Sequence, residues 1–454
     1  MRRYMCSYNS PTFLFQPIEL LSLAAIAEKH SYQAQLVDAI AENLSSDQVS
    51  SIIKQAVPDF IVCLSGFECI EEDLQEINSL KTQFPSIPIV LFGHYAGIFK
   101  QEIMEKTSVD FVIDGEPDLV FQDWLLALAS GQEFRELEGL SFRRSGEIVH
   151  TPSKGRIINP NELPDPAFHL LDNRHYSEPF FPKPYGLLQS ARGCPYQCNF
   201  CVKSYGTKLT SLTPERMIQQ LETYIQLHHI QSYRFIDDTF TAVPSRVIEF
   251  CKLLIEKNIL LPWSCLCRPD TLQPDMLDWM KKAGCKRLYI GVESGSQKVI
   301  HYLNKKFEVK EAEKNIRIAH QKGFELMGFF MVGYPIETKE DLQQSLRFAI
   351  RSGMSFIVVS AITPYPGTAL YDQLSQSIQF QLLPYQNEFK DPELRKKARA
   401  FQSQFIRSFY LHPVIWWRIS NHFFAHSLDF LQNTFSLLGY LFTRNKKIKR
   451  KDYI

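Results

Sequence analysis

The stretch ARGCPYQCNFCVKSYG, residues 191–206, contains three cysteines, Cys194, Cys198 and Cys201, in a C-x3-C-x2-C spacing. A structural zinc site uses four nitrogen or sulfur ligands, usually as two separated pairs, and no fourth Cys or His follows at such a spacing. A cubane [4Fe–4S] cluster bound by three thiolates instead leaves one iron open to another ligand. The spacing therefore indicates an iron–sulfur site, with three structural thiols as the alternative interpretation.

Apolar runs typical of buried parallel strands begin just before this loop and continue after it. The six runs are YGLLQSA (185–191), SYRFID (232–237), WSCLCR (263–268), KRLYIGVE (286–293), LMGFFMVGY (326–334) and FIVVSAIT (356–363). Helical patterns separate them, such as 213–226, where Thr213 is a good N-cap and Pro214 takes the first helical position. Six strand–helix units are too few for a closed eight-stranded barrel. We therefore predict a partial (β/α)6 TIM-like barrel over residues 184–375.

The residues that follow these runs are mostly polar, glycine or proline. They are Asp237, Asp238, Arg268, Glu293, Ser294, Gly333, Tyr334, Thr363, Pro364 and Tyr365. In strand–helix barrels the catalytic groups lie at the carboxyl ends of the strands. The pattern predicts a single site at this rim, shared with the cysteine loop.

The first part of the chain, residues 1–135, alternates apolar runs with helix-like stretches in a similar way. The predicted strands are AQLVDA (34–39), FIVCL (60–64), PIVLF (88–92) and VDFVI (109–113). This alternation predicts an α/β fold with a doubly wound (Rossmann-like) sheet. Ligands of such sheets bind beyond the carboxyl ends of the strands, here near Ser65, Gly66, Gly93, His94, Gly115 and Glu116.

Two further segments complete the predicted organisation. Residues 136–183 contain a hairpin that turns at Ser145 and Gly146, followed by a Pro-rich linker. Residues 376–454 are predicted to be helical with a basic tail. Apolar residues Leu428, Leu431, Phe435, Leu438 and Phe442 recur there at helical spacing, and six of the eight residues 444–451 are basic. This tail is either an interfacial helix that meets anionic lipids or a helix docked on the barrel with a solvated charged end.

Composition narrows the setting of the protein. The 454 residues are 45% hydrophobic and carry a net charge of +1, so there is no electrostatic case for a nucleic-acid partner. The ten cysteines are too sparse for a disulfide scaffold, and neither a signal peptide nor an apolar run long enough to span a membrane is apparent. We expect a cytoplasmic protein, in which Cys251, Cys265, Cys267 and Cys285 are core thiols.

The cysteine spacing, with the aromatic Phe200 just before the last cysteine, resembles the motif of radical S-adenosylmethionine (SAM) enzymes. The strand-end stretches FIDDTFT, GVESGSQKVI and GFFMVGYPIET also resemble that family. The first domain, its ending VDFVIDGEP and the linker NELPDPAFHLLD resemble the subgroup with an N-terminal cobalamin-binding domain. The resemblance covers about residues 1–370.

The resemblance implies roles for named residues. Cys194, Cys198 and Cys201 would ligate the cluster, whose open iron would bind SAM. SAM would be contacted by Phe200, Asp237, Asp238, Arg268, Glu293, Ser294 and Gly333, and cobalamin by Ser65, Gly66, Gly93, His94, Gly115 and Glu116. Each has an ordinary structural alternative, such as an ion pair of Arg268 with Asp270 or Glu293. The chain lacks the Asp-x-His-x-x-Gly motif of many cobalamin proteins, and two acids replace the Gly-Gly-Glu stretch common in the family.

The implied reaction is methylation of an unactivated carbon of a small-molecule or lipid-like substrate. One SAM would methylate cobalamin and a second would yield the 5′-deoxyadenosyl radical, with an electron donor such as flavodoxin or ferredoxin. Two alternatives stay open. The first is a cobalamin-dependent cyclase or rearrangement enzyme without methyl transfer, and the second is a non-catalytic cobalamin- or metal-binding sensor.

Overall fold

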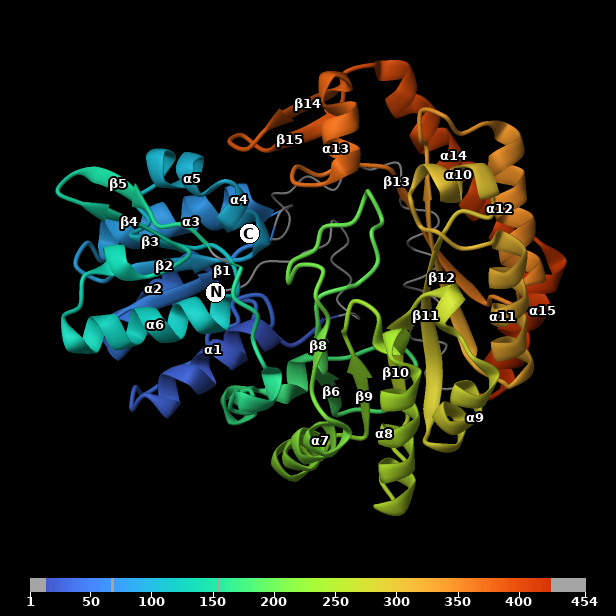
Figure 1. The fold of residues 1–454 in the computed structure, drawn as a ribbon, viewed down its shortest axis with the longest axis horizontal. Coiled ribbons are helices and arrows are strands. Elements are labelled where there is room, and N and C mark those ends of the chain that lie inside the picture. The colour runs from blue at the N-terminus through green and yellow to red at the C-terminus, as the bar shows by residue number, and fades with distance from the viewer. Residues whose placement is uncertain (1–13, 67–68, 154, 426–454) are drawn as a thin grey trace.

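The computed structural model consists of two sheets, each flanked by helices, that lie side by side (Figure 1). The structure describes residues 14–66, 69–153 and 155–425. The predicted tail helix around Leu428–Phe442 and the basic residues 444–451 lie outside the described residues. Among the described helices, none has both the length and the apolar character needed to cross a bilayer.

The first sheet has five strands in the order β1 (Ile61–Leu64), β2 (Ile89–Phe92), β3 (Phe111–Ile113), β4 (Leu140–Arg144) and β5 (Glu147–His150). The first three strands are parallel, and β4 and β5 are antiparallel additions. Six helices accompany it: α1 (Ile18–Lys29), α2 (Ser46–Ala56), α3 (Ile70–Gln83), α4 (His94–Ile98), α5 (Lys100–Lys106) and α6 (Pro117–Ser130).

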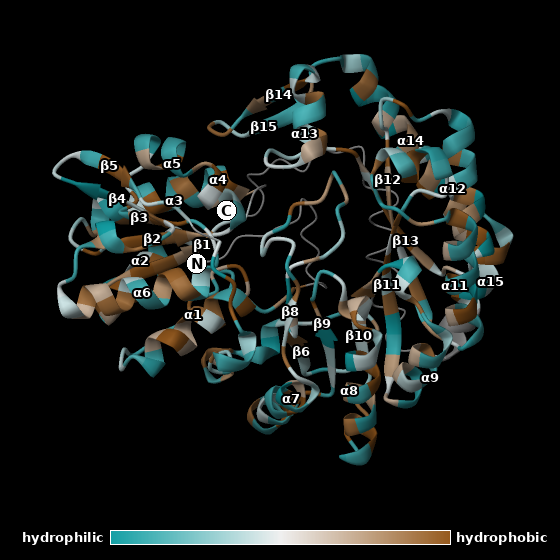
Figure 2. Cartoon of the chain, in the orientation of Figure 1, coloured by the Kyte–Doolittle hydropathy of each residue, from teal (hydrophilic) through white to brown (hydrophobic). Residues whose placement is uncertain are grey.

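Strand β2 shows why the strands of this sheet are apolar along their whole length. Val90 and Phe92 pack in one cluster with α1 and α6, whereas Ile89 and Leu91 pack in a second cluster with α2, α3 and α5. All four side chains are buried, because helices cover both faces of the sheet. Brown, apolar strands enclosed by helices with teal outer sides are visible in this unit in Figure 2.

Two predictions for this unit need correction. Residues 34–39 form no strand, and within this loop Asp38 accepts a hydrogen bond of 2.8 Å from the Tyr176 hydroxyl. The hairpin assigned to the connecting segment 136–183 instead extends the first sheet as β4 and β5. Its turn is as predicted: Ser145 and Gly146 have φ of 50° and 86°, the left-handed pair that suits a two-residue hairpin loop.

The second sheet contains the six predicted strands, all parallel. They are β6 (Tyr185–Leu188), β9 (Ser232–Phe235), β10 (Trp263–Cys267), β11 (Cys285–Glu293), β12 (Glu325–Val332) and β13 (Phe356–Ala361), in the spatial order β13-β12-β11-β10-β9-β6. The accompanying helices are α7 (Pro214–His228), α8 (Pro244–Glu256), α9 (Pro274–Lys282), α10 (Gln297–Tyr302), α11 (Val309–Gln321) and α12 (Lys339–Arg351). The predicted cap is confirmed, since the Thr213 hydroxyl accepts a hydrogen bond from the Arg216 amide.

The C-terminal region differs from the prediction that it is helical throughout. After α13 (Ala369–Leu374), a hairpin of β14 (Ile378–Gln381) and β15 (Gln386–Phe389) precedes α14 (Pro392–Tyr410) and α15 (Pro413–Ala425). Tertiary contacts explain the hairpin, because the buried side chain of Leu382 at its turn joins the core of the first unit. Helix α14 covers the edge strand β13, where Gln402 Nε2 donates a 2.7 Å hydrogen bond to the Val359 carbonyl.

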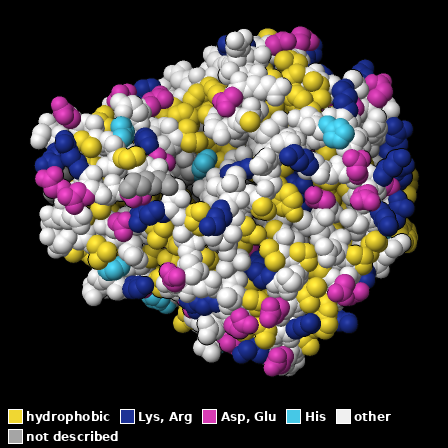
Figure 3. All heavy atoms as spheres, in the orientation of Figure 1, with side chains coloured by type: hydrophobic (Ala, Val, Ile, Leu, Met, Phe, Trp, Pro, Cys, Tyr) yellow, Lys and Arg dark blue, Asp and Glu magenta, His cyan; other side chains and the backbone are white. Residues whose placement is uncertain are grey.

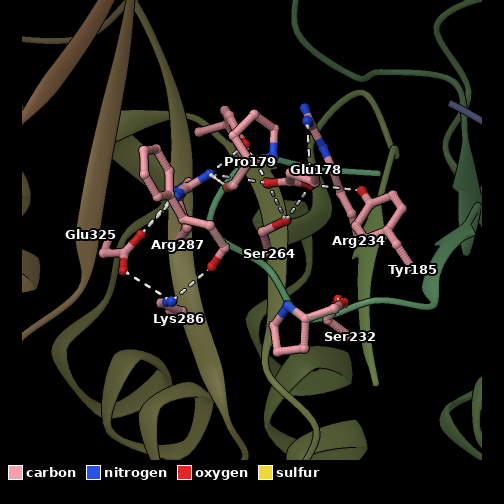
Figure 4. Close-up of polar contacts among 12 residues, drawn as sticks. Glu178, Pro179, Tyr185, Ser232, Arg234, Ser264, Lys286, Arg287 and Glu325 are labelled. Carbon is pink, nitrogen blue, oxygen red and sulfur yellow. Dashed lines mark hydrogen bonds and ion pairs between the residues drawn. The ribbon is translucent and has the colours of Figure 1, made fainter. Parts of the chain in front are cut away.

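A buried polar cluster lies inside the second sheet, and Figure 4 shows its members. At its centre is Glu178 from the linker, with its side chain fully buried. The carboxylate accepts hydrogen bonds from the hydroxyls of Tyr185, at 2.6 Å, and Tyr289, and pairs with Arg287 Nη1 at 3.3 Å. Arg287 also pairs with Glu325 at 2.9 Å. The linker is therefore fixed to several strands by buried charges.

Candidate functional site

The cysteine loop is closed at its base by two short antiparallel strands, β7 (Ala191–Arg192) and β8 (Thr210–Ser211). The Cys194 amide donates to the Gly206 carbonyl at 3.2 Å, which narrows the loop further. Gly193 has φ of 77°, and a Cβ there would lie 2.3 Å from the Lys208 carbonyl oxygen. Only glycine fits this position, so the Gly193 of the sequence motif is required by the loop itself.

The middle of the loop is bonded to elements on the rim of the second sheet. Asn199 receives the Leu370 amide on its carbonyl at 2.9 Å and donates its own amide to the Leu303 carbonyl at 3.1 Å. Its side chain donates to the Tyr302 carbonyl at 2.8 Å. The chain between Cys198 and Cys201 is thus held against the end of α10 and the start of α13.

The three cysteines are free thiols on this one loop. Cys201 is exposed, yet the surrounding protein atoms and then the charges of Asp238 and Cys198 raise its pKa to about 12. A thiolate at this position is unfavourable on its own, and a bound metal cation would stabilise it. No three His, Cys, Asp or Glu side chains of the described residues converge as ligands of one ion. A cubane does not need such convergence, because each of its thiolates binds a different iron. The free thiols and their loop therefore fit a cluster.

Arg268, at the end of β10, lies directly against the cysteine loop. Its guanidinium lies 3.8 Å from the centre of the Tyr196 ring, and Nη1 donates to Cys198 Sγ at 3.3 Å. The same side chain pairs with Asp270 at 2.9 Å and donates to the Lys305 carbonyl at 2.7 Å. The ion pair of Arg268 with Asp270, which was the structural alternative to a SAM contact, is therefore present. The guanidinium also orients the cysteine loop. Tyr196 and Lys305 were not predicted, because neither shows a pattern in the sequence.

Glu293, at the end of β11, is paired with a lysine. Lys305 Nζ lies 2.7 Å from Glu293 Oε1, and both side chains are about nine-tenths buried. The Phe200 ring lies 5.8 Å from the same ammonium group, so the pair lies beside the cysteine loop. Glu293 has φ of 67°, a left-handed conformation that non-glycine residues rarely adopt and that is often found at functional sites.

The two acids after β9 have different surroundings. Asp237 is buried and accepts hydrogen bonds from the Ser190 amide, at 2.6 Å, and from its hydroxyl, at 2.5 Å. It also pairs with Arg246 at 3.4 Å. Asp238 is accessible, and the surrounding protein, followed by the charge of Asp237, raises its pKa to about 6. Of the two, Asp238 is the acid that can meet a ligand.

The residues after Glu293 form a buried hydrogen-bond network with α12. The hydroxyls of Ser294 and Ser345 are 3.0 Å apart, and the Ser296 hydroxyl donates to Asp341 at 2.6 Å. The Ser294 side chain is fully buried in this network, so it presents no exposed surface in this structure. Asp341 also caps α12, since its carboxylate and the Thr338 hydroxyl form a reciprocal capping box.

Replacement of Asp341 by Asn is expected to lower the free energy of unfolding by about 1–2 kcal/mol at neutral pH. Although burial acts to raise it, hydrogen bonds from Ser296 and Thr338 lower the pKa of Asp341 to about 2. This stabilisation is complete above the unfolded pKa of about 4 and is lost as the pH falls toward the folded value. Urea unfolding of both proteins across this range should show the difference shrinking at low pH. Asp275→Asn, in the first turn of α9 without a cap bond, is the control.

Gly333, after β12, is packed against α14. Its φ is 93°, and a Cβ there would lie 2.3 Å from the Ala398 Cβ. Its amide donates to Glu337 at 2.5 Å, and burial raises the pKa of Glu337 to about 7. The helix contact alone accounts for this glycine, so a SAM contact stays a prediction.

The carboxyl ends of β1 and β2 lie against each other. The buried Ser65 hydroxyl donates to Asp73 at 2.9 Å, and a Cβ on Gly93 would lie 2.3 Å from the Ser65 carbonyl oxygen. Gly66 follows directly on this edge. The ring of His94 is 5.3 Å from that of Tyr95, and burial lowers the pKa of His94. A half-buried, neutral imidazole therefore lies at this edge beside small residues.

The end of β3 is joined to the cysteine loop by a buried ion triad. Arg192, two residues before Cys194, lies 2.5 Å from Glu116 and 2.6 Å from Asp118. The three side chains are 6%, 9% and 2% exposed. Burial raises the pKa of Glu116 to about 7 against the opposing charge of Arg192. Gly115, directly before, has φ of 110°, and its Cβ would meet the Ser153 hydroxyl at 2.8 Å.

The Asp118→Asn variant is expected to lose about 3 kcal/mol of unfolding free energy, because it leaves the buried Arg192 guanidinium only partly compensated. Chemical denaturation of the two proteins measures the difference. Asp123→Asn, which removes the more exposed partner of Arg156, should change the free energy by no more than about 1 kcal/mol. Equal losses of unfolding free energy in both variants would show that the triad stabilises the protein no more than a surface ion pair does.

The rims of the two sheets meet around this loop. Val202, just after the last cysteine, packs against the first unit's core, which includes Cys63 and Tyr95. The Tyr95 ring also lies 6.2 Å from that of Tyr365, beyond the end of β13. The carboxyl edges of both sheets therefore converge on one region. The predicted core thiols Cys251, Cys265, Cys267 and Cys285 are buried within the second sheet and its helices and do not belong to the cysteine loop.

Residues 188–349 match the sequence model of the Radical SAM superfamily. The chain is 27% identical over 413 residues to an uncharacterized methyltransferase of Pyrococcus horikoshii, covering 88% of each chain. It is 24% identical to a cytidylyl-2-hydroxyethylphosphonate methyltransferase of Streptomyces wedmorensis, covering 78% of this chain and 77% of that one. It is also 24% identical to an anaerobic magnesium-protoporphyrin IX monomethyl ester cyclase of Rubrivivax gelatinosus, covering 76% of this chain but only 63% of the relative.

Solved structures with a similar fold include two enzymes that bind cobalamin. The cobalamin-dependent SAM radical enzyme OxsB superposes with a TM-score of 0.75 at 16% identity, over 88% of this chain and 65% of its own. The radical SAM methyltransferase TsrM from Kitasatospora setae, with cobalamin and a [4Fe–4S] cluster bound, gives 0.66 at 14% identity, over 81% and 76%. At these identities the likeness concerns the fold.

Proposed function

The chain contains a radical SAM domain, and on that premise we propose that the protein is a cobalamin-dependent radical SAM enzyme that methylates an unactivated carbon. The observation that carries the proposal is the loop with Cys194, Cys198 and Cys201, placed where the carboxyl edges of the two sheets meet. Both methyltransferase relatives extend over more than three quarters of the chain.

The three cysteines would hold the [4Fe–4S] cluster. Bound to this chain, the cluster supplies the electron that cleaves SAM, and cobalamin supplies the methyl group. Asp238 is the accessible acid for the SAM amino group, because Asp237 is already bonded to Ser190 and Arg246. Arg268 and Lys305 lie at the same rim, each paired with an acid, and a SAM carboxylate would share their hydrogen-bond donors with Asp270 and Glu293.

We infer that the first sheet, with α1 to α6, is the cobalamin domain and that the second sheet is a partial (β/α)6 barrel. Because β4 and β5 belong to the first sheet, the inferred bounds are 1–150, in place of the 1–135 expected from the sequence, and 184–375, with the connecting segment 151–183 and the C-terminal region 376–454. His94 and the small residues Ser65, Gly66, Gly93 and Gly115 border the edge that faces the cysteine loop. The fold shared with OxsB and TsrM supports this assignment.

The second sheet favours an apolar substrate. On β12, Leu326 and Phe330 pack in the helix-covered core, whereas Met327, Phe329 and Met331 alternate with them on the opposite face and are half-buried. Side chains of this kind bind an apolar small molecule or lipid-like body by removing its surface from water. A hopanoid C-2 methylase of Rhodopseudomonas palustris is among the relatives, matched over 47% of this chain.

The test is the anaerobically purified protein, supplied with SAM and an electron donor such as reduced flavodoxin. Its absorption spectrum should contain both cluster and corrin bands. Product analysis should find 5′-deoxyadenosine, and S-adenosylhomocysteine once an acceptor substrate is present. A preparation that retains neither iron nor a corrin would reject the proposal in favour of a non-catalytic protein.

The cyclase relative of Rubrivivax gelatinosus supports a second candidate, a radical reaction without methyl transfer. S-adenosylhomocysteine separates the two, because only methyl transfer from SAM produces it. If 5′-deoxyadenosine forms with substrate and S-adenosylhomocysteine does not, the cyclase or rearrangement function is the correct one.

A further inference from the structure

Four large apolar side chains are exposed around the turn between α14 and α15. Leu411, Val414, Trp416 and Trp417 are 72%, 40%, 55% and 65% exposed. Exposed single apolar residues are normal on protein surfaces, but a group of four within seven residues, including two tryptophans, marks an interaction site.

The turn is rigidly attached to the second sheet. Ile415 is fully buried and Ile419 packs against the same core, so one side of α15 is anchored. Arg418 Nη1 donates to the Met354 carbonyl at 2.9 Å, which fixes the helix to the segment before β13. The exposed tryptophans are therefore presented by a docked helix and not by a loose end.

After Glu393, the charged residues of α14 and α15 are all basic. No Asp or Glu occurs between Glu393 and Asp429, whereas Arg395, Lys396, Lys397, Arg399, Arg407 and Arg418 lie in that interval. Arg407 is exposed one helical turn before Leu411. Elsewhere, Lys and Arg side chains are mixed with those of Asp and Glu over the face shown in Figure 3. The whole chain has a net charge of only +1, so this excess is local.

We propose that the α14–α15 turn is a docking surface for an anionic lipid bilayer. Trp416 and Trp417 lie at the depth of the headgroups, and Arg407 meets lipid phosphates. Tryptophan suits this boundary because its ring is apolar and its N–H is polar. A second copy of the chain is a poorer occupant, because a two-fold interface would bring the same cations against each other. The proposal is independent of the reaction that the enzyme catalyses.

The experiment uses the full chain with vesicles of phosphatidylcholine, alone or mixed with phosphatidylglycerol. We expect the protein to sediment with the mixed vesicles and to bind at least about tenfold more weakly to phosphatidylcholine alone. Brominated lipids should quench part of the tryptophan fluorescence of the wild type, because Trp416 and Trp417 are exposed, whereas Trp124 and Trp263 are buried and Trp279 is half-buried. This measurement needs no variant.

Three variants locate the contact. The double substitution Trp416→Ser, Trp417→Ser should weaken binding at least about tenfold, and Arg407→Glu about fivefold or more. Leu260→Ser, which replaces a 50% exposed leucine elsewhere on the surface, should bind like the wild type. Unchanged binding of the double variant overturns the proposal. If binding were lost only in a Lys446→Glu, Lys447→Glu variant, the contact would belong to the tail. Absence of binding to both vesicles, or a dimer that the double variant abolishes, also overturns it.

Discussion

Cys198→Ala is expected to abolish formation of 5′-deoxyadenosine, by at least about three orders of magnitude relative to the wild-type protein. The variant removes one of the three thiolates proposed to hold the cluster. It also removes the sulfur to which Arg268 Nη1 donates at 3.3 Å, so the guanidinium loses one of its contacts with the loop. Iron and sulfide content, measured on the same anaerobic preparation, should fall together with the nucleoside product.

The matched control is Cys267→Ala. Cys267 is only 4% exposed and lies on β10, directly before Arg268, so its removal tests a nearby thiol that is not on the loop. This variant should keep its cluster and its product, with at most a modest loss of stability from the small cavity. Full activity of the Cys198 variant would contradict the cluster assignment, and equal losses in both would point to general misfolding.

Glu178→Gln is expected to lower the free energy of unfolding by about 3–5 kcal/mol, the largest stability effect that we predict. The carboxylate accepts from Tyr185 and Tyr289 and pairs with the buried Arg287. An amide group would remove the negative charge and place an N–H donor against groups that are themselves donors. Chemical denaturation, monitored by tryptophan fluorescence, to which the buried Trp124 and Trp263 contribute, measures the change.

Asp172→Asn provides the comparison for this experiment. Asp172 pairs with Arg174 at 2.5 Å, but Arg174 is 88% exposed, and an ion pair in water contributes no more than about 1 kcal/mol. A small effect in Asp172→Asn and a large one in Glu178→Gln would establish that the buried cluster anchors the linker. If Glu178→Gln were as stable as the wild type, the cluster would not be important for folding.

Local signals in the sequence predicted much of the fold. The six strands of the second sheet were found from continuous apolar runs, and the start of α7 from Thr213 followed by Pro214. The Ser145–Gly146 turn was found in the same way, since few residue pairs adopt two left-handed conformations. These features depend on neighbouring residues, which the sequence places side by side.

The features that were missed depend on residues far apart in the chain. Arg192 and Asp118 are separated by 74 positions, and nothing near either one indicates its partner. The alternating run 34–39 looked like a strand, but its Leu36 packs partly buried against the cores on both sides without joining a sheet. The packing of Gly333 against Ala398 of a distant helix was also not predicted, and the SAM contact of Gly333 stays a prediction.

The position of the candidate site could be predicted from the sequence, whereas most of its contacts could not. Strand ends brought Arg268 and Glu293 to the cysteine loop as expected. Asp270 was one of two candidate partners of Arg268, whereas Lys305, the partner of Glu293, could not be chosen from the sequence, because several lysines follow the strands. Whether each predicted residue contacts a cofactor stays a prediction.

The Arg192 triad limits how far the two units can be treated as separable modules. A cut in the linker would leave a buried guanidinium on one half and the carboxylates of Glu116 and Asp118 on the other. Each half would then carry an uncompensated charge beside its own rim, at a cost of several kcal/mol. Because the guanidinium belongs to the base of the cysteine loop, this loop is held in place by both units together and not by the second sheet alone.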